Sequence, residues 1–190
     1  EASGVERVLI LNDDAEVHPD CVDKLRKAWR AEDGALAPVL QDGQGRRWSG
    51  IDLFRSGRVR MRAGVKGGPV DAVSGACMLM RVTERFDPDF VHGFEDVELC
   101  QRLCRKGAVV RVVSDALCTH VGGATIDPRS RFAQRAALSG HLRLVDRSWK
   151  RGFVVALAVS QVVRERGPAN RFLGIVDGCR DHWWSDQSVA

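Results

Sequence analysis

A short apolar run that ends abruptly in acidic residues is the feature that most constrains the fold of this chain. Val8–Leu11 is continuously apolar and is followed by Asn12-Asp13-Asp14. Continuous apolar runs of this length are typical of strands that are buried on both faces. Open α/β sheets bind ligands at the carboxyl ends of their strands. The pattern therefore predicts a buried strand that delivers carboxylates to a ligand site.

The remaining patterns before residue 128 predict alternating helices and strands. Apolar spacing, Pro at helix starts and Gly at helix ends place most of the boundaries, with Gly34 ending the first helix and Gly107 the second. A buried strand containing Gly75 suggests a close approach of ligand or backbone at that glycine. The expected elements are helices over 19–30 and 95–107, strands over 35–40, 70–82 and 109–113, and a hairpin or active-site loop within 43–68, with segments 51–54 and 58–62 on either side of residues 55–57.

The last third of the chain is expected to be helical. Three helices are predicted at about 130–149, 151–166 and 170–183, separated by Gly152 and by Gly167-Pro168. A chain of 190 residues can bury one substantial core with appendages. We therefore expect an α/β core over residues 1–128 and a helical extension over residues 129–190.

Composition and charge narrow the class of protein. The sequence is 44% hydrophobic and 28% charged, which excludes a largely disordered chain. The net charge of +4 is modest, but arginines recur in the last third and predict an anionic partner there. A membrane surface and a solvated helical face remain open alternatives, whereas no motif supports nucleic acid. These arginines are Arg129, Arg131, Arg135, Arg143, Arg147, Arg151, Arg164, Arg166, Arg171 and Arg180.

The spacing of the cysteines and the length of the apolar runs indicate the cellular compartment. The six cysteines form no CxxC pair and no regular framework, which favours a reducing cytosol. Cys100 and Cys104 lie one helical turn apart, but two ligands do not make a zinc site, so packing is the simpler interpretation. No apolar run reaches the ~18 residues that a membrane span needs. We expect a cytoplasmic protein whose membrane contact, at the inner face of the plasma membrane, is peripheral.

Three groups of polar residues have the chemistry of a catalytic site. The acidic turn at 12–14 offers hard oxygen ligands for Mg²⁺ or Mn²⁺, although acidic residues are also common in turns after strands. Glu95 and Asp96 begin a helix, where carboxylates either stabilise the helix dipole or serve as a general base. His120 either completes a metal site or is an ordinary loop histidine.

The order of these groups along the chain resembles the family 2 inverting glycosyltransferases, in particular the bacterial rhamnosyltransferase-like members. The matching segments span about 115 residues. They are Leu11-Asn12-Asp13-Asp14 with Pro19, Ser74-Gly75-Ala76-Cys77-Met78-Leu79-Met80-Arg81, Phe86-Asp87-Pro88-Asp89-Phe90, Gly93-Phe94-Glu95-Asp96-Val97-Glu98-Leu99-Cys100-Gln101-Arg102, and His120-Val121-Gly122-Gly123.

The resemblance implies a partial GT-A fold, which is a Rossmann-like mixed sheet with flanking helices, and a role for each matching residue. By likeness, Asp14 and His120 would be metal ligands, and Asp96 would be the catalytic base, with Glu95 orienting it or contacting the acceptor. Asn12 stands where some relatives place a first carboxylate, and Asp13 would lie near the donor sugar or ribose. Gly75 and Ala76 would line the sugar and acceptor pocket.

The implied activity is that of a metal-dependent inverting hexosyltransferase. It would use Mn²⁺ or Mg²⁺ to hold a nucleotide-sugar donor, with dTDP-rhamnose suggested by likeness alone, and a cell-envelope polysaccharide or lipid-linked acceptor. The alternative is a catalytically silent binding or assembly module of the same ancestry. Relatives place a nucleotide-binding strand, helix and strand before the acidic motif, whereas eleven residues precede Asn12 here. The chain is therefore expected to correspond to the C-terminal two thirds of such an enzyme.

Overall fold

The computed structural model describes residues 5–122, 126–127, 129–145, 148–165 and 169–183, and within them the chain forms two compact units. The first contains residues 1–53, 59–86 and 96–124 and is called the sheet unit. The second contains residues 54–58, 87–95 and 125–190 and is called the helical unit. Both units are therefore assembled from separate stretches of sequence.

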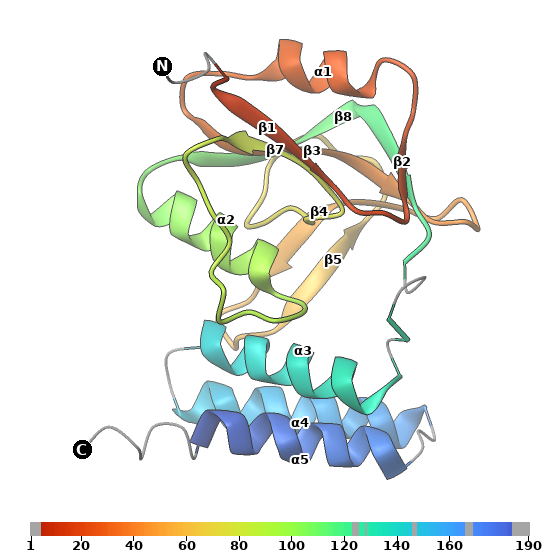
Figure 1. Cartoon of the computed structure of the whole chain (residues 1–190), viewed down its shortest axis with the longest axis vertical. Coiled ribbons are helices and arrows are strands. Elements are labelled where there is room, and N and C mark those ends of the chain that lie inside the picture. Colours follow the sequence, from red (N-terminus) through yellow and green to blue (C-terminus); the bar gives the residue numbers. More distant parts are fainter. Residues whose placement is uncertain (1–4, 123–125, 128, 146–147, 166–168, 184–190) are drawn as a thin grey trace. The chain divides into compact units, whose positions relative to one another are not determined.

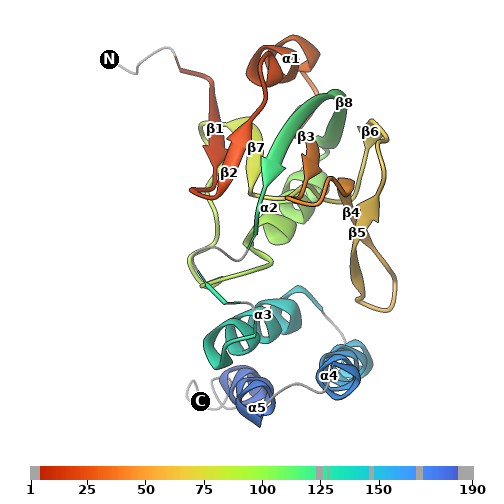
Figure 2. The ribbon, with the colours of Figure 1, turned by 90° about the vertical axis from the view of Figure 1, so that its right-hand side faces the viewer.

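The sheet unit is built on a mixed eight-stranded sheet (Figures 1 and 2). Its path runs β1-β7-β3-β4-β5, and β8 pairs with β2, β3 and β6. Among the described pairs, β3 and β8 alone are parallel. This architecture confirms the expected α/β class with a mixed sheet. The strands are β1 Arg7–Leu11, β2 Ala15–Val17, β3 Asp33–Gln41, β4 Arg47–Leu53, β5 Val59–Ala63, β6 Gly68–Pro69, β7 Cys77–Arg81 and β8 Val109–His120.

The core of this sheet is the pairing of β3 with β8. Eight of the nine residues of β3 are buried, in the pattern of a central strand. Pro38 lies inside β3, where its missing N–H would break a regular ladder. The register shifts immediately after it, from Pro38↔Val113 to Val39↔Leu117, so the proline lies at an irregularity. The partner strand β8 continues beyond this bulge as far as His120.

The extent of β8 corrects two expectations. The apolar pattern predicted a strand over 109–113, but the observed strand is longer. Ser114 and Asp115 are exposed at the bulge, and pairing with β3 resumes at Leu117. His120 is therefore the last residue of a strand and not a loop residue. The backbone of a paired strand positions its side chain more rigidly than a loop would.

The strand before the acidic motif also differs from the expectation. β1 is half-buried, with Leu11 43% exposed, because in the described chain β1 pairs with β7 alone and antiparallel to it. The segment 70–82 is not one strand, since β7 begins at Cys77 and Gly75 lies just before it. The two strands around residues 54–58 do form the expected hairpin.

Helices α1 (Cys21–Ala28) and α2 (Glu95–Arg105) cover opposite faces of the sheet (Figures 1 and 2). Cys21 and Leu25 of α1 pack with Leu36, Leu79 and Val113. α1 ends before Trp29, and Gly34, which was expected to end it, lies inside β3. Gly107, at φ +85°, ends α2 as predicted, because a glycine adopts this left-handed conformation without steric cost.

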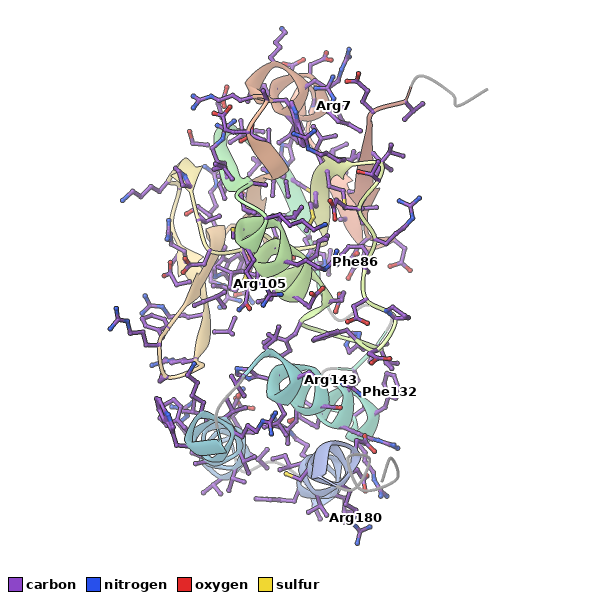
Figure 3. The ribbon with its side chains drawn as sticks, turned by 90° about the vertical axis from the view of Figure 1, so that its left-hand side faces the viewer. Arg7, Phe86, Arg105, Phe132, Arg143 and Arg180 are labelled. Atoms are coloured by element: carbon purple, nitrogen blue, oxygen red, sulfur yellow. The ribbon has the colours of Figure 1, made fainter. Side chains whose placement is uncertain are left out.

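The helical unit contains α3 (Arg131–Leu144), α4 (Ser148–Arg164) and α5 (Ala169–Trp183). Three helices were expected here, but Gly152 lies within α4 and does not separate two helices; Gly167 and Pro168 lie outside the described residues. α3 and α5 approach closely at Gly174, where an added Cβ would lie 2.6 Å from the carbonyl oxygen of Arg131. Figure 3 shows Phe132 and Arg143 along α3.

A left-handed turn at Gly93-Phe94 is held by α3 within the helical unit. Phe94 has φ +71°, which costs a non-glycine residue about 1–2 kcal/mol. Its ring stacks on His141, with centroids 4.5 Å apart, and His141 Nε2 lies 2.7 Å from the Gly57 carbonyl oxygen. Burial lowers the pKa of His141, although the Gly57 carbonyl opposes this shift. Gly140 has no side chain to obstruct the Gly93 carbonyl, which would lie 2.7 Å from a Cβ there.

A buried ion pair links the start of β3 to β8. Arg111 donates from Nε and Nη2 to Asp33, at 2.8 and 2.5 Å, and the Asp33 side chain is fully buried. Asp33 raises the pKa of Arg111, mainly through its hydrogen bonds. Arg111 also donates to the Ala28 carbonyl at 2.7 Å, and the Arg30 N–H donates to Asp33 at 2.7 Å. The end of α1 is thus attached to the central strands.

Removal of Asp33 alone should lower the free energy of unfolding far more than removal of both Asp33 and Arg111. Asp33→Ala leaves the Arg111 charge buried without a counter-charge, so the free energy of unfolding should fall by about 3–5 kcal/mol. Asp33→Leu combined with Arg111→Met removes both charges and should cost less. Urea denaturation followed by circular dichroism measures both. A double variant less stable than the single would contradict this account.

Candidate active site

A tight turn after β1 brings the acidic motif to the end of β8. The Asn12 carbonyl accepts a hydrogen bond from the Ala15 N–H at 3.2 Å, and Ala15 then pairs with His120 in the β2·β8 ladder. The Val121 N–H donates to the Asp14 carbonyl at 3.2 Å. Asp14 Oδ1 consequently lies 3.0 Å from His120 Nε2. The two residues expected to bind metal are in direct contact, and their side chains are 12% and 25% exposed.

The Asp14–His120 pair has the donor chemistry of an open divalent-metal site. Carboxylate oxygens suit Mn²⁺ and Mg²⁺, and imidazole is a common ligand of transition metals. No group of three or more His, Cys, Asp or Glu residues in the described chain is arranged to hold an ion. Two protein ligands fit an ion that also binds substrate oxygens and water, and do not fit a closed structural site.

The carboxylate of Asp96 is fixed by two backbone N–H groups. Gly75 N–H donates to Oδ2 at 2.9 Å, and Val97 N–H donates to Oδ1 at 2.7 Å. On the other side of the same loop, the Asn12 N–H donates to the Ala76 carbonyl at 3.0 Å. The loop at Gly75-Ala76 is therefore bonded both to the acidic turn and to the start of α2. The structure brings Asn12, Gly75, Ala76 and Asp96 into one hydrogen-bonded network.

The other expected site residues differ in exposure. Asn12 and Asp13 are exposed at the turn, as substrate-contacting residues would be. Glu95 is the first residue of α2 and is grouped with the helical unit, whereas Asp96 is grouped with the sheet unit. Glu95 Oε2 is buried and has no hydrogen-bond partner among the described residues. A buried carboxylate oxygen without a partner is costly, and such cost is often retained for function.

Cys100 and Cys104 do not form a ligand pair. Cys100 is fully buried and its thiol contacts the backbone of Val73, with Sγ 3.5 Å from the nitrogen. Desolvation raises the pKa of Cys100 to about 12, which keeps the thiol protonated at neutral pH. Cys104 is exposed on the same helix. The packing interpretation of Cys100 is consistent with this environment.

A cavity of about 330 Å³ in the sheet unit was not predicted from the sequence. His120 forms part of its wall, so the cavity adjoins the proposed metal pair. The hairpin segment was expected to be either a hairpin or an active-site loop, and its base in fact contributes to this wall. His120, Val121 and Gly122 of the wall belong to the last matching segment of the sequence. No motif marked the other contributing residues, which come from β3, β4, β5 and the turn between β3 and β4. They include Leu40, Asp42, Arg46, Trp48 and Met61.

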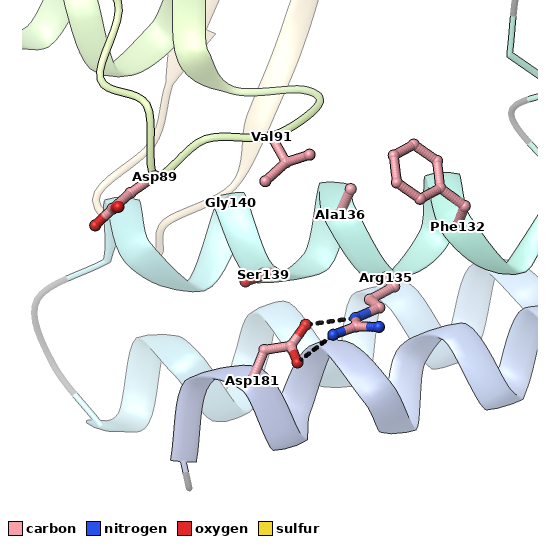
Figure 4. A pocket seen from close by; sticks show the side chains of 8 residues that line it. All are labelled: Asp89, Val91, Phe132, Arg135, Ala136, Ser139, Gly140 and Asp181. Atoms are coloured by element: carbon pink, nitrogen blue, oxygen red, sulfur yellow. Dashed lines mark hydrogen bonds and ion pairs between the residues drawn. The ribbon is translucent and has the colours of Figure 1, made fainter. Parts of the chain in front are cut away.

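A second cavity, of about 250 Å³, lies in the helical unit (Figure 4). Val91 and Phe132 contribute apolar surface, and Arg135 and Asp181 form an ion pair at 2.7 Å on its wall. No residue expected to take part in catalysis lines this cavity. Its composition alone does not indicate a ligand.

Several of the arginines expected to bind an anionic partner are paired within the helical unit. Their carboxylate partners lie 2.6–3.2 Å away, which leaves less free positive charge than the sequence suggests. Arg147 and Arg166 lie outside the described residues. Among the described helices, none combines the length and the apolarity needed to cross a membrane. The pairs are Arg131–Asp177, Arg135–Asp181, Arg143–Asp89 and Arg171–Glu165.

Comparison with solved structures supports the GT-A fold. The chain resembles GalNAc-T7 in its crystal structure with UDP, GalNAc and Mn²⁺, with a TM-score of 0.57 and 13% sequence identity. The similarity covers 83% of this chain and 35% of that chain. The chain thus spans about a third of the length of that enzyme. At this identity the likeness shows a shared GT-A fold only.

Comparison of sequences identifies the family. No curated protein matches the chain significantly. The family model described as "Glycosyl transferase family group 2" matches residues 7–164, which include β1, the acidic turn, Asp96 and His120. On this match over most of its length, the chain belongs to glycosyl transferase family group 2.

Proposed function

We propose that this chain transfers a sugar from a nucleoside-diphosphate donor to a saccharide or lipid-linked acceptor of the cell envelope, with inversion at the anomeric carbon. Family membership supports glycosyl transfer, and the remaining details are inferred from the site. The observation that carries the proposal is the Asp96 carboxylate, which two backbone N–H groups orient at 2.9 and 2.7 Å. dTDP-rhamnose is the donor that the sequence resemblance suggests.

Asp96 acts as the general base in this proposal. As the acceptor oxygen forms its bond to the anomeric carbon, the acceptor proton passes to Asp96. The bond between that carbon and the donor phosphate breaks, and its electron pair leaves with the nucleoside diphosphate. One displacement from the opposite face inverts the anomeric configuration.

Asp14 and His120 hold a divalent ion in this proposal. When bound, such an ion would offset the negative charge of the donor's diphosphate. The Mn²⁺ and UDP present with GalNAc-T7 support manganese and a nucleotide donor as the first choices to test, with Mg²⁺ as the alternative. Asn12, Asp13, Gly75, Ala76 and Glu95 are the proposed substrate contacts.

Loss of either proposed ligand should weaken metal-dependent nucleotide binding. Calorimetry with Mn²⁺ and a panel of nucleoside diphosphates and nucleotide sugars should give a Kd that rises about tenfold or more in Asp14→Ala and His120→Ala, because each supplies a ligand. His92→Ala is a matched control, since His92 belongs to the helical unit. Unchanged binding in Asp14→Ala would refute the assignment. Binding without turnover by any donor would favour the silent-module alternative.

Asp96→Asn should separate catalysis from folding. The amide oxygen can keep one of the two backbone hydrogen bonds but cannot accept the acceptor proton, so turnover should fall by about 100- to 10,000-fold. Thermal unfolding and metal-dependent nucleotide binding should change little. Radiolabelled sugar transfer measures the rate. Glu98→Gln is the matched control, since Glu98 lies two residues further along α2 and its carboxylate accepts from Arg102 at 3.0 Å. Equal losses in both variants would argue against Asp96 as the base.

We also propose a peripheral contact between the helical unit and an anionic lipid surface at the cytoplasmic face of the plasma membrane. Several large apolar side chains are exposed on α4 and α5, beside Lys150 and Arg180. Apolar side chains next to basic residues suit insertion at an anionic interface. The exposed set is Trp149 (57%), Phe153 (38%), Val163 (61%), Phe172 (38%), Leu173 (47%) and Val176 (48%).

Vesicle binding tests this contact. The chain should co-float with vesicles containing phosphatidylglycerol more than with neutral phosphatidylcholine vesicles. Trp149→Ser with Phe153→Ser should weaken partitioning by about tenfold or more, because two apolar side chains lose their burial in lipid. Val91→Ser is a matched control, since Val91 is 75% exposed but lies outside α4 and α5. Equal flotation of all three proteins would exclude this surface.

A further inference from the structure

The cavity beside His120 has an apolar part and a polar part. Leu40, Trp48 and Met61 contribute the apolar surface, from the paired strands β3, β4 and β5. Asp42 and Arg46 contribute the polar surface, from the turn between β3 and β4. The volume of about 330 Å³ is at the lower end of the range for small-molecule sites.

Hydrogen bonds within the polar part connect its groups to one another. Asp42 Oδ1 accepts from the backbone N–H groups of Gln44 and Arg46, each at 2.9 Å, and Oδ2 accepts from Arg46 Nε at 2.7 Å. Burial opposes ionisation, but these bonds hold the pKa of Asp42 below its ordinary value. The Arg46 guanidinium lies over the Trp48 ring, 5.7 Å from its centre. Carboxylate, guanidinium and aromatic ring are therefore held next to one another.

These groups match the two chemical sides of a sugar ring. A pyranose has a face of C–H bonds, which packs against the electron-rich face of an aromatic ring, and an edge of hydroxyl groups, which donate to carboxylates and accept from guanidinium. The carboxylate and guanidinium are already paired, so the site offers little excess charge to a phosphate. A neutral polyol suits this balance better than an anion does.

We propose that this cavity is a saccharide subsite, in which a pyranose packs on Trp48 and its hydroxyls bond to Asp42 and Arg46. The inference rests on the proposed function, because His120 is shared between the cavity wall and the proposed metal pair. The ring that occupies the subsite belongs to the donor or to the acceptor. Both sources share the chemistry recognised here.

Saturation-transfer NMR on the full chain distinguishes the two sources. One arm uses a panel of methyl pyranosides, which stand for the acceptor, and another uses nucleotide sugars with diamagnetic Mg²⁺. A third arm uses nucleoside diphosphates with Mg²⁺ and contains no pyranose. We expect saturation and upfield ring-current shifts at pyranose C–H protons in the first or the second arm. The arm that responds identifies the substrate to which the ring belongs.

Variants of Trp48 and Asp42 test whether the pyranose NMR signals come from binding in this cavity. Trp48→Leu keeps an apolar side chain but removes the ring, so the pyranose Kd should rise about tenfold and the ring-current shifts should disappear. Trp48→Phe should retain the shifts, and Asp42→Asn should weaken binding several-fold. Trp29→Leu is a matched control, because Arg7 lies 5.6 Å from the Trp29 ring centre in an equivalent arrangement outside the cavity.

The outcomes separate this inference from the proposed function. Pyranose binding that is equal in wild type, Trp48→Leu and Asp42→Asn would overturn the subsite, as would the absence of pyranose signals in both sugar arms. If the third arm still shows metal-dependent binding in those cases, the metal assignment stands without the subsite. If pyranoside binding depends on Trp48 but no metal-dependent nucleotide binding occurs, the subsite stands and the donor site fails.

Discussion

The parallel pairing of β3 with β8 is the constraint on which the rest of the sheet unit depends. It is the one parallel pair among the described strands, and the Asp33–Arg111 ion pair fastens its beginning inside the protein. Beyond the bulge after Pro38, the last residues of β8 pair with β3 on one side and with β2 on the other. The contact between Asp14 and His120 is a consequence of this path.

The fold class and several of its elements could be predicted from the sequence, because local residue patterns specify these elements. The helix that starts at Glu95 and ends at Gly107 and the hairpin around residues 54–58 follow from apolar spacing and glycine placement. The length of β8 could not be predicted, since two exposed residues in the middle of a strand look like its end. The half-burial of β1 depends on its single described neighbour, and no local pattern encodes a neighbour.

The candidate site was predictable as a set of residues but not as a geometry. The resemblance named Asp14, Asp96 and His120, and the structure places Asp14 against His120 and holds Asp96 through Gly75. The cavity at Trp48 could not be predicted, because apart from His120, Val121 and Gly122 its wall combines residues whose spacing follows no motif. The pairing of arginines in the helical unit could not be predicted either, since composition does not reveal which charges meet a carboxylate within the same unit.

The discontinuous make-up of the helical unit determines how the chain can be divided. Residues 54–58 and 87–95 belong to this unit although they precede its helices in the sequence. The Gly57 carbonyl bonds His141, and Phe94 stacks on the same ring. A fragment that begins at residue 125 would contain every helix of the unit and lack both of these partners. The His141 ring would then lose the Gly57 carbonyl and the Phe94 ring that contact it. A cut placed where the helices begin would therefore produce an incomplete domain.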